Sequence, residues 1–488
     1  MRYDQKIVIF NSIESFEIIY HHLGGVMHYI FCRKAMFAAL TILTAVVCVI
    51  GTGCSSGDNN ATSEKVYFPR IGNYADLYLR GSYDVLGMIH KRELAKIGEA
   101  AKIGASRKMN GGTIYSNIWT PHIMYAGACD ETVPGNPNIA PDYRITDRRQ
   151  KELPELGAGD FLMIANPGKQ DLRAKGCYFV GIGFPMATNR YSPPGFNDHP
   201  DITMESQVDI MIYTWGPKED GLVTPRLTPH LKICPTSPMT VVGYWLMTAQ
   251  LAHNLAYEDT SGTYVAAEKY LDTLMDRLDM FHKNTIGDVN EIGEIMAEKI
   301  LAGGKIYPWS SRWEFYQEAN GTAGSVMGIY PLHTRGAYTG PGIYEPPEFD
   351  PEDLEENDIV LLAMAGDDPA GDIEMAEKVR AKGGFLVGIY PFEREDGFST
   401  APLRELCDFS LDNLSGDNDG VLDIPGYDSK IIPTVAPMNN YAYWAILGAY
   451  VEALENRDVA PYYWMSWHVP GGKAYTDSIH VHFLERGY

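Results

Sequence analysis

One segment of the chain occurs twice, and both copies carry the pattern strand, loop, helix, strand. The first copy runs from Asp160 to Pro185 and the second from Asp358 to Pro391. Each copy opens with an aspartate and a short apolar run, and a glycine-containing loop separates that run from a second one. Short apolar runs between turn signals are typical of strands buried on both faces. Because a crossover of this length makes the joined strands parallel, each copy predicts a parallel α/β sheet.

The segments around this repeat also recur in the same order. The matching pairs are Gly111–Tyr115 with Gly303–Tyr307, Val208–Tyr213 with Cys407–Asp412, Lys232–Thr236 with Lys430–Thr434, and Tyr244-Trp245 with Tyr443-Trp444. Two copies are too few for a solenoid and predict a pseudo-dimer of two α/β domains. We therefore divide the chain into an N-terminal extension with a signal peptide (1–53), a tether (54–68), two domains (69–260 and 261–459) and a C-terminal tail (460–488).

The N-terminal region has the features of a bacterial export signal. Arg33 and Lys34 precede an uncharged apolar run, Ala35–Ile50, and small residues then lead to Cys54. A basic start, an apolar core and small residues before the cleavage point are typical of a secretory signal. A cysteine at this point predicts lipidation at Cys54 and a lipoprotein anchored in the membrane of the bacterial cell envelope, at the periplasm or the cell surface. A plain signal peptide or an uncleaved anchor is the alternative.

Composition excludes some partners and cofactors. The net charge of −23 over 488 residues argues against nucleic acid as a partner. The four cysteines that would remain after processing, Cys129, Cys177, Cys234 and Cys407, show no CxxC spacing, so we predict no metal and no other cofactor.

A long uncharged segment, 238–257, is close in length to a membrane span. Polar residues dilute it, and its counterpart, Met438–Glu455, contains Glu452 and Glu455. Both segments therefore predict buried helices that serve packing or dimerisation, and a homo-oligomer is one expected outcome.

The ordered set of motifs resembles the sugar isomerase (SIS) domain, especially its phosphoheptose-isomerase-like branch. The resemblance covers 74–258 and 265–456, and it includes a GG-x-IY segment at Gly111–Tyr115 and a PTS segment at Pro235–Ser237. It implies two tandem three-layer α/β/α domains, each with a mainly parallel sheet of about five strands. It also implies a sugar ligand at the carboxyl ends of the strands and a pseudo-two-fold axis.

The chain departs from this family where phosphate would bind. A phosphate loop needs hydroxyls and free backbone N–H groups. The matching loops here are Ala165–Gln170, which lacks hydroxyls, and Ala365–Gly371, which carries Asp367 and Asp368. We therefore expect a pocket for a non-phosphorylated sugar or sugar derivative, or domains without catalytic activity.

Two residues are candidates for catalysis if the chain is an aldose–ketose isomerase that acts through an enediol. His122 would open the sugar ring, and Glu314 would abstract a proton from carbon. The alternatives are a loop histidine bonded to backbone and a carboxylate at a helix start. The expected ligand-binding residues are Ser116, Asn117, Thr120, Asn166, Lys169, Thr236, Ser237, Ser310, Ser311, Arg312, Asp367, Asp368 and Thr434.

A protein without catalysis is the second reading, as a carbohydrate-recognition or scaffolding lipoprotein of the envelope. The tail is expected to cover the domain interface. Its His480 and His482 alternate as in a strand, with both rings on one face.

Overall fold

A computed structural model of the chain divides into two compact units, 1–67 and 68–488. In the first unit, β1 (Val8–Ile9) pairs antiparallel with β2 (Phe16–Glu17). The predicted signal and Cys54 lie outside the described residues. Among the described residues, no helix is long and apolar enough to cross a membrane. The structure describes 8–9, 16–17, 73–117, 156–165, 176–183, 204–217, 221–311, 315, 318–320, 322–330, 349–364, 369–394, 398–416, 420–426, 430–465 and 471–488.

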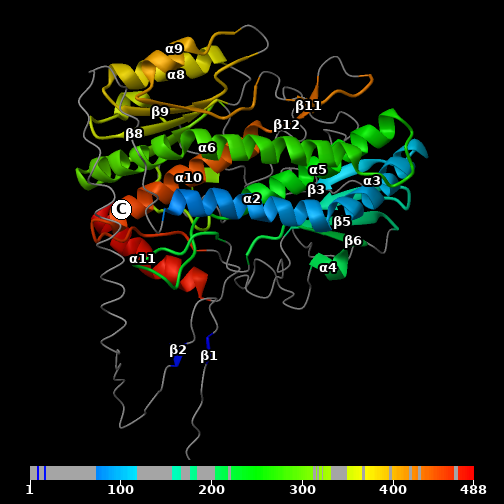
Figure 1. Cartoon of the computed structure of the whole chain (residues 1–488). Coiled ribbons are helices and arrows are strands. Elements are labelled where there is room, and N and C mark those ends of the chain that lie inside the picture. Colours follow the sequence, from blue (N-terminus) through cyan, green and yellow to red (C-terminus); the bar gives the residue numbers. More distant parts are fainter. Residues whose placement is uncertain are drawn as a thin grey trace, which may run out of the picture. The chain divides into compact units, whose positions relative to one another are not determined.

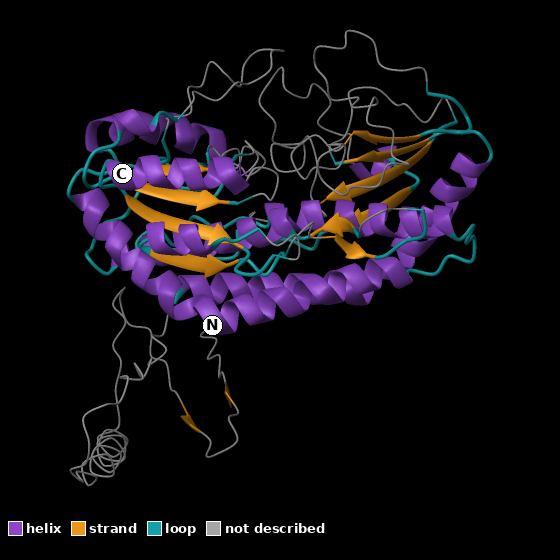
Figure 2. Ribbon diagram, turned by 90° about the horizontal axis from the view of Figure 1, so that it is seen from above, coloured by secondary structure: helices purple, strands orange, loops and turns teal. Residues whose placement is uncertain are grey.

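Two parallel sheets of four strands confirm the predicted pair of α/β domains (Figures 1 and 2). The first copy contains α2 (Tyr74–Arg92), α3 (Leu94–Met109), β3 (Ile114–Asn117), β4 (Phe161–Ile164), β5 (Tyr178–Gly183), α4 (Met204–Gln207), β6 (Ile210–Tyr213) and α5 (Ser237–Ala256). The second contains α6 (Val265–Leu301), β7 (Ile306–Trp309), η5 (Pro351–Asp353), β8 (Ile359–Ala363), α8 (Pro369–Ala381), β9 (Phe385–Tyr390), α9 (Ala401–Leu406), β10 (Phe409–Asp412), β11 (Gly420–Leu422), β12 (Ile431–Pro433) and α10 (Val435–Glu455). The strand orders are β3-β4-β5-β6 and β7-β8-β9-β10.

The expected fifth strands pair elsewhere in the described part of the chain. β12 pairs antiparallel with β11, and Ile233 forms an antiparallel bridge with Val223. Each of these segments pairs antiparallel with a segment that closely precedes it in the same copy, so neither extends a parallel sheet. The tail also differs from expectation, because His480 and His482 lie in helix α11 (Gly472–Arg486) and not in a strand. In a helix, residues two apart do not share a face.

The aspartate that opens each repeat binds backbone at the amino end of its sheet. Asp160 accepts hydrogen bonds from the N–H groups of Gly157 and Thr113, at 2.7 and 2.8 Å. Asp358 does the same for Glu355 and Lys305, at 2.9 and 2.8 Å. These carboxylates join the first two strands of each sheet and are therefore structural.

The central helices α5 and α10 are buried on almost every side, as predicted. Buried Trp245 and Trp444 occupy equivalent positions in them. The two helices touch near their N-termini, where the Tyr441 hydroxyl lies 3.4 Å from Met239 Sδ.

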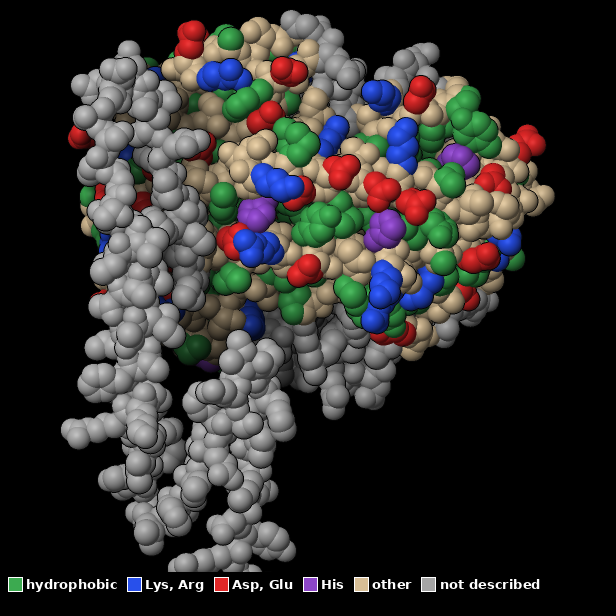
Figure 3. Space-filling model, in the orientation of Figure 1, with side chains coloured by type: hydrophobic (Ala, Val, Ile, Leu, Met, Phe, Trp, Pro, Cys, Tyr) green, Lys and Arg blue, Asp and Glu red, His purple; other side chains and the backbone are tan. Residues whose placement is uncertain are grey.

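The first helices of the two copies are exchanged. α2 belongs to the first copy in sequence but packs against α6 and α10 of the second, and Figure 1 shows these helices side by side. The backbone N–H of Tyr74 donates to Glu452, and its hydroxyl donates to Glu455 at 2.6 Å. On the face that carries α2 and α6, acidic, basic and histidine side chains are interspersed (Figure 3).

The backbone itself records the duplication. Six residues other than glycine have positive φ in the described regions, and they fall into three pairs at equivalent points of the copies. The pairs are Trp215 with Leu414, Cys234 with Ile432, and Glu258 with Asp458. A positive φ is uncommon for a bulky residue. Since both copies have it at the same places, the strain belongs to the shared fold and does not mark a functional site.

The C-terminal tail packs on both copies, as expected. Trp464 exchanges backbone hydrogen bonds with Gly324 and Ser325 of the second copy. In the first copy, the His230 ring lies 6.4 Å from the ring of Tyr475 on α11.

Candidate functional site

The carboxyl ends of the two sheets are the natural place for a ligand, because open α/β folds bind there. The N-termini of α5 and α10 follow Thr236 and Thr434, which are both fully buried. Neither threonine caps its helix through its side chain. The Thr434 hydroxyl accepts a hydrogen bond from Arg277 instead, whereas the Thr236 hydroxyl has no hydrogen-bond partner in the described part of the chain.

A buried carboxylate from the second copy meets the N-terminus of α5. Ser237 Oγ donates to Glu318 Oε1 at 2.5 Å, and Trp444 Nε1 donates to the same oxygen at 2.7 Å. Glu318 is only 1% exposed. A carboxylate at such depth is costly unless it is hydrogen-bonded, and these two bonds offset that cost. Through Glu318, the PTS segment of the first copy is joined to the central helix α10 of the second.

The face of α10 that meets Glu318 carries further polar groups. The Tyr443 hydroxyl donates to the carbonyl of Ala319 at 3.2 Å, and burial raises its pKa well above the ordinary value. Asn440 lies one turn earlier on the same face, because residues three and four apart are neighbours on a helix. Asn440 is 7% exposed.

Two buried hydroxyls of the first copy also have no partner. Thr214 directly follows β6, and Thr236 directly precedes α5. Both are fully buried, and neither Oγ1 has a hydrogen-bond partner in the part of the chain that the structure describes. A methyl of Thr214 and a methyl of Ile182 on β5 both lie close to Gly243 of α5.

The equivalent groups of the second copy are satisfied by the protein itself. Asn413 donates to Asn439 at 2.9 Å, and Asn439 donates to the carbonyl of Met364 at 3.1 Å. Arg277, on α6, donates to Thr434 Oγ1. The two copies thus share a backbone but differ in how their carboxyl ends are filled.

We place Thr214, Thr236, Ser237, Glu318 and Asn440 together as the junction site. Its polar groups come from the first sheet, from the start of α5, and from the face of α10 that meets Glu318. Hydroxyl, amide and carboxylate groups of this kind bind a polyhydroxylated ligand by hydrogen bonding. Within the described residues, no group of three or more His, Cys, Asp or Glu side chains is placed to hold a metal ion.

The predicted site residues fall into two groups. Thr236 and Ser237 lie in the junction site, and Thr434 lies at the matching point of the second copy. Ser116 is half-buried on β3, while Ser310 and exposed Ser311 follow β7. The others lie outside the described residues or, for Asn117 of β3, have an undescribed side chain; they are His122, Glu314, Thr120, Asn166, Lys169, Arg312, Asp367 and Asp368.

Sequence reasoning missed Glu318, Thr214, Asn440 and Arg277. Glu318 gives no local signal, because its partners Ser237 and Trp444 are 81 and 126 residues away. The unequal filling of the copies has one sequence signal. In the repeat, Arg277 of α6 stands where α2 has Val85.

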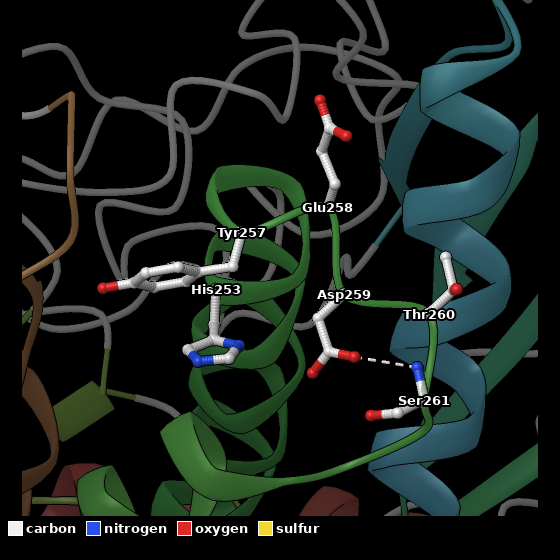
Figure 4. A pocket seen from close by; sticks show the side chains of 6 residues that line it. All are labelled: His253, Tyr257, Glu258, Asp259, Thr260 and Ser261. Atoms are coloured by element: carbon white, nitrogen blue, oxygen red, sulfur yellow. Dashed lines mark hydrogen bonds between the residues drawn. The ribbon is translucent and has the colours of Figure 1, made fainter.

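A separate surface hollow lies at the other end of α5 (Figure 4). It has a volume of about 630 Å³ and is lined by His253, Tyr257, Glu258, Asp259, Thr260 and Ser261. Hydrogen bonds from Ser261 and Thr263 lower the pKa of Asp259 to about 2. Figure 4 shows Glu258 pointing away from His253 and Asp259, so these side chains do not converge on one point.

Comparison with known proteins gives similar structures but no similar sequence. No family model matches the chain, and no curated protein sequence matches it. The C-terminal domain of glucosamine-fructose-6-phosphate aminotransferase from Francisella tularensis has 11% identity and a TM-score of 0.38, over 75% of this chain and 96% of that one. A structure from Silicibacter pomeroyi, described as a phosphosugar isomerase, has 12% identity and a TM-score of 0.41, over 78% and 98%.

A Salmonella typhimurium structure, described as a sugar binding protein, has 10% identity and a TM-score of 0.33, over 76% of this chain and 97% of that one. At this level of similarity, activity and ligand have to be inferred from the chain's own residues.

Proposed function

We propose that the protein binds a non-phosphorylated sugar or sugar derivative at the junction site. The observation that carries the proposal is the contact of Ser237 with Glu318, a buried carboxylate from the other copy at the carboxyl end of the first sheet. The buried hydroxyls of Thr214 and Thr236, which have no hydrogen-bond partner in the described part of the chain, support it. Buried polar groups without partners call for an explanation, and a ligand that hydrogen-bonds to them supplies one.

The arrangement is suited to aldose–ketose isomerisation. Glu318 takes the place that we expected Glu314 to fill, as the base that removes a proton from the carbon beside a carbonyl. The electron pair of that C–H bond forms the enediol double bond, and the carbonyl oxygen takes up a proton. A proton then returns to the former carbonyl carbon, and the hydroxyl on the other carbon loses its proton to become the new carbonyl, so the isomerisation needs no oxidant and no cofactor.

The second candidate is a recognition or scaffolding protein without catalysis. One observation favours it, because Glu318 Oε1 already accepts two hydrogen bonds and the residue is only 1% exposed. A base that is engaged in this way would have to exchange partners before reacting. The two candidates share the same ligand site and differ only in turnover.

The test is a thermal-shift and calorimetric screen of 55–488 against D-glucose, D-glucosamine, D-glucuronate and D-glucose 6-phosphate. A ligand at 100 times its Kd stabilises the folded state by about 2.7 kcal/mol. Glu318→Gln keeps an acceptor oxygen for Ser237 and Trp444 but removes the charge. We expect it to lose both the sugar-induced shift and any isomerisation followed by NMR, whereas Glu374→Gln, on the surface of α8, keeps them.

A response to D-glucose 6-phosphate alone would contradict the choice of a non-phosphorylated ligand. Binding without turnover in the wild type would select the second candidate.

We further propose that the chain is an exported lipoprotein attached to the cell envelope through lipid on Cys54. Metabolic labelling with a radioactive fatty acid tests this proposal. Label that persists after Cys54→Ser would contradict it.

A further inference from the structure

Trp444 is a core residue of α10 whose one polar side-chain atom bonds to Glu318. Its indole is fully buried, and the Tyr443 ring packs edge-on against it, with ring centroids 4.8 Å apart and planes at 69°. The N–H group of an indole can donate a hydrogen bond but cannot accept one. The 2.7 Å bond from Trp444 Nε1 therefore places a fixed donor against Glu318 Oε1.

Other contacts hold the backbone that carries Glu318. The Phe315 ring packs edge-on against Tyr443, with ring centroids 5.6 Å apart. The carbonyl of Ala319, the next residue after Glu318, accepts hydrogen bonds from Tyr443 at 3.2 Å and from Ser325 at 3.0 Å. These contacts fasten the segment to α10 without Trp444, so the indole bond acts on the carboxylate itself.

The repeat separates the packing role of this tryptophan from its hydrogen bond. Trp245 of α5, the counterpart of Trp444, is also fully buried, and Tyr244 packs edge-on against it, with ring centroids 5.4 Å apart and planes at 67°. Its Nε1 has no hydrogen-bond partner in the part of the chain that the structure describes. A tryptophan at this point of the fold thus packs the core with or without such a bond, and the bond to Glu318 is an additional property of Trp444.

The bond also acts on the charge of Glu318. Hydrogen bonds to the ionised form of a carboxyl group favour that form, and Oε1 receives two of them, from Ser237 and Trp444. A general base has to be ionised before it can take up a proton. Both donors therefore favour the state that Glu318 needs in the proposed reaction.

Three other ionisable groups of the same cluster stay neutral in acid. Glu318 acts electrostatically on Tyr78 of α2 and Tyr443 of α10, and Cys234 acts on the same two tyrosines. Cys234 Sγ also lies 3.4 Å from the carbonyl of Trp444. Burial raises the pKa of all three groups above the ordinary value. Among these four groups, only Glu318 titrates below pH 7.

We propose that Trp444 is a positioning residue, whose indole N–H holds Glu318 Oε1 beside Ser237 at the start of α5 and favours the ionised carboxylate. The catalytic part of this inference deepens the proposed function and rests on it. The effect of Trp444 on the charge of Glu318 does not, and it is tested on protein without a ligand.

The first experiment compares Trp444→Phe with Trp245→Phe, which both remove a buried indole N–H and keep an aromatic ring. We expect the Tm of Trp444→Phe to lie further below that of the wild type at pH 7 than at pH 4, by about 1–3 °C. The sign follows because a bond to the ionised carboxylate stabilises above the pKa of Glu318 and is lost as the pH falls through it. Trp245→Phe should lower the Tm equally at both pH values. A deficit in Trp444→Phe that is equally independent of pH would overturn the proposal.

The indole signals give a second readout that needs no tryptophan substitution. In protein labelled with ¹⁵N-tryptophan, we expect one indole N–H signal to move in acid, as Glu318 takes up a proton, and to lose this response in Glu318→Gln. Glu374→Gln, on the surface of α8, should leave the response unchanged. A titration that persists in Glu318→Gln, or an indole spectrum without any response to that substitution, would overturn the proposal.

Turnover tests the catalytic part. With any sugar that the wild type isomerises, we expect Trp444→Phe to lower kcat about tenfold and to change KM less than twofold. The acid limb of its pH profile should move up by about one pH unit, because one donor fewer favours ionised Glu318. Trp245→Phe should keep the wild-type profile, and an unchanged acid limb in Trp444→Phe would overturn the positioning role. If the wild type isomerises no sugar, the proposed catalysis fails, while the Tm and indole measurements still decide whether Trp444 controls the charge of Glu318.

Discussion

His282 Nε2, on α6, lies 2.8 Å from Asp76 Oδ1, on α2, and this contact joins the two exchanged helices. Its counterpart across the pseudo-two-fold axis is looser, because His90 Nε2 lies 4.0 Å from Glu268 and 3.2 Å from Asp272. His282 and Asp76 are also less exposed, at 20% and 23%, than His90 and Glu268, at 39% and 41%. Hydrogen bonds with lower exposure contribute more to stability. The contact of His282 with Asp76 should therefore stabilise the fold more than the contacts of His90.

We therefore expect His282→Ala to lower the free energy of unfolding by about 1 kcal/mol and His90→Ala by less than half of that. Urea denaturation measures both. His482→Ala, on exposed α11 with Glu485 at 3.8 Å, is the control and should change stability by less than about 0.5 kcal/mol. An equal loss for His282 and His90 would contradict the expected difference in strength between the two contacts.

Glu455 is a second link between the copies. It is 1% exposed and accepts hydrogen bonds from the Tyr74 hydroxyl at 2.6 Å and from the backbone N–H groups of Arg226 and Leu227 at 2.8 Å. Glu455→Gln replaces an acceptor oxygen by a donor NH₂ that faces donors, so we expect a loss of about 2–4 kcal/mol by denaturation. Tyr74→Phe, which removes one donor, should cost about 1 kcal/mol. A Glu455→Gln protein of wild-type stability would contradict this role.

The glycines that precede the first strands have no room for a side chain. A Cβ on Gly112 would lie 2.0 Å from the carbonyl oxygen of Gly159, and one on Gly304 would lie 2.1 Å from that of Asn357. We expect either glycine-to-alanine change to destabilise its copy by more than 2 kcal/mol, because the obstacle is backbone. Gly287→Ala is the matched control: it lies within α6 with open space around its Cβ position, and alanine should stabilise by about 0.5–1 kcal/mol. Thermal denaturation of the three variants gives the comparison.

Arg277 gives a chemical test of its position. Arg277→Ala leaves the Thr434 hydroxyl without its guanidinium partner and should lower stability by about 1–2 kcal/mol. Free guanidinium at low millimolar concentration should restore part of the Tm of this variant, because it can re-enter the vacated space. The same concentration of sodium chloride should not. Equal effects of the two salts would mean that the vacated space does not bind guanidinium.

Three cysteines of the described part of the chain predict a pH response, namely buried Cys177 and Cys234 and half-buried Cys407. Burial raises the pKa of the Cys407 thiol and of the Cys177 thiol to about 12, and it raises the pKa of Cys234 further. At pH 8 we expect iodoacetamide to modify these three only after unfolding, as read by peptide mass spectrometry. Fast labelling of the native protein at any of them would contradict their burial.

The same thiols make folding less favourable in alkali. Their folded pKa lies above the unfolded value of about 8.5, so the stabilisation is complete below that pH and is lost as the pH rises toward 12. A stability that rises between pH 9 and pH 11 would contradict this sign.

The duplication and the parallel strands could be predicted because they depend on local patterns. Apolar runs such as 161–164 and 359–363 are buried along their whole length, and each is flanked by turn residues. The fifth strand could not be predicted correctly, since a short apolar segment such as 431–433 pairs equally well with a neighbour in its own loop. The prediction of a strand at His480 and His482 was wrong for a similar reason, because an alternation over three residues is too short to distinguish a strand from a helix.

The candidate site was predictable only in part. The PTS segment pointed to Thr236 and Ser237, because hydroxyls before a helix are a local signal. Glu318 was out of reach, since a carboxylate looks like a surface residue in the sequence until its distant partners, Ser237 and Trp444, are folded against it. The partnerless state of Thr214 is a property of packing, and no sequence pattern encodes it.

The exchange of α2 and α6 has a consequence for how this molecule can vary. Two separate identical subunits would acquire every substitution in both of their clefts at once, so a residue that closed one cleft would close the other. Here both copies are encoded in a single reading frame, so each copy can acquire substitutions by itself. The exchanged helices hold the two copies together while they diverge. Two identical subunits could not combine a valine and an arginine at this one position, as the chain does with Val85 and Arg277.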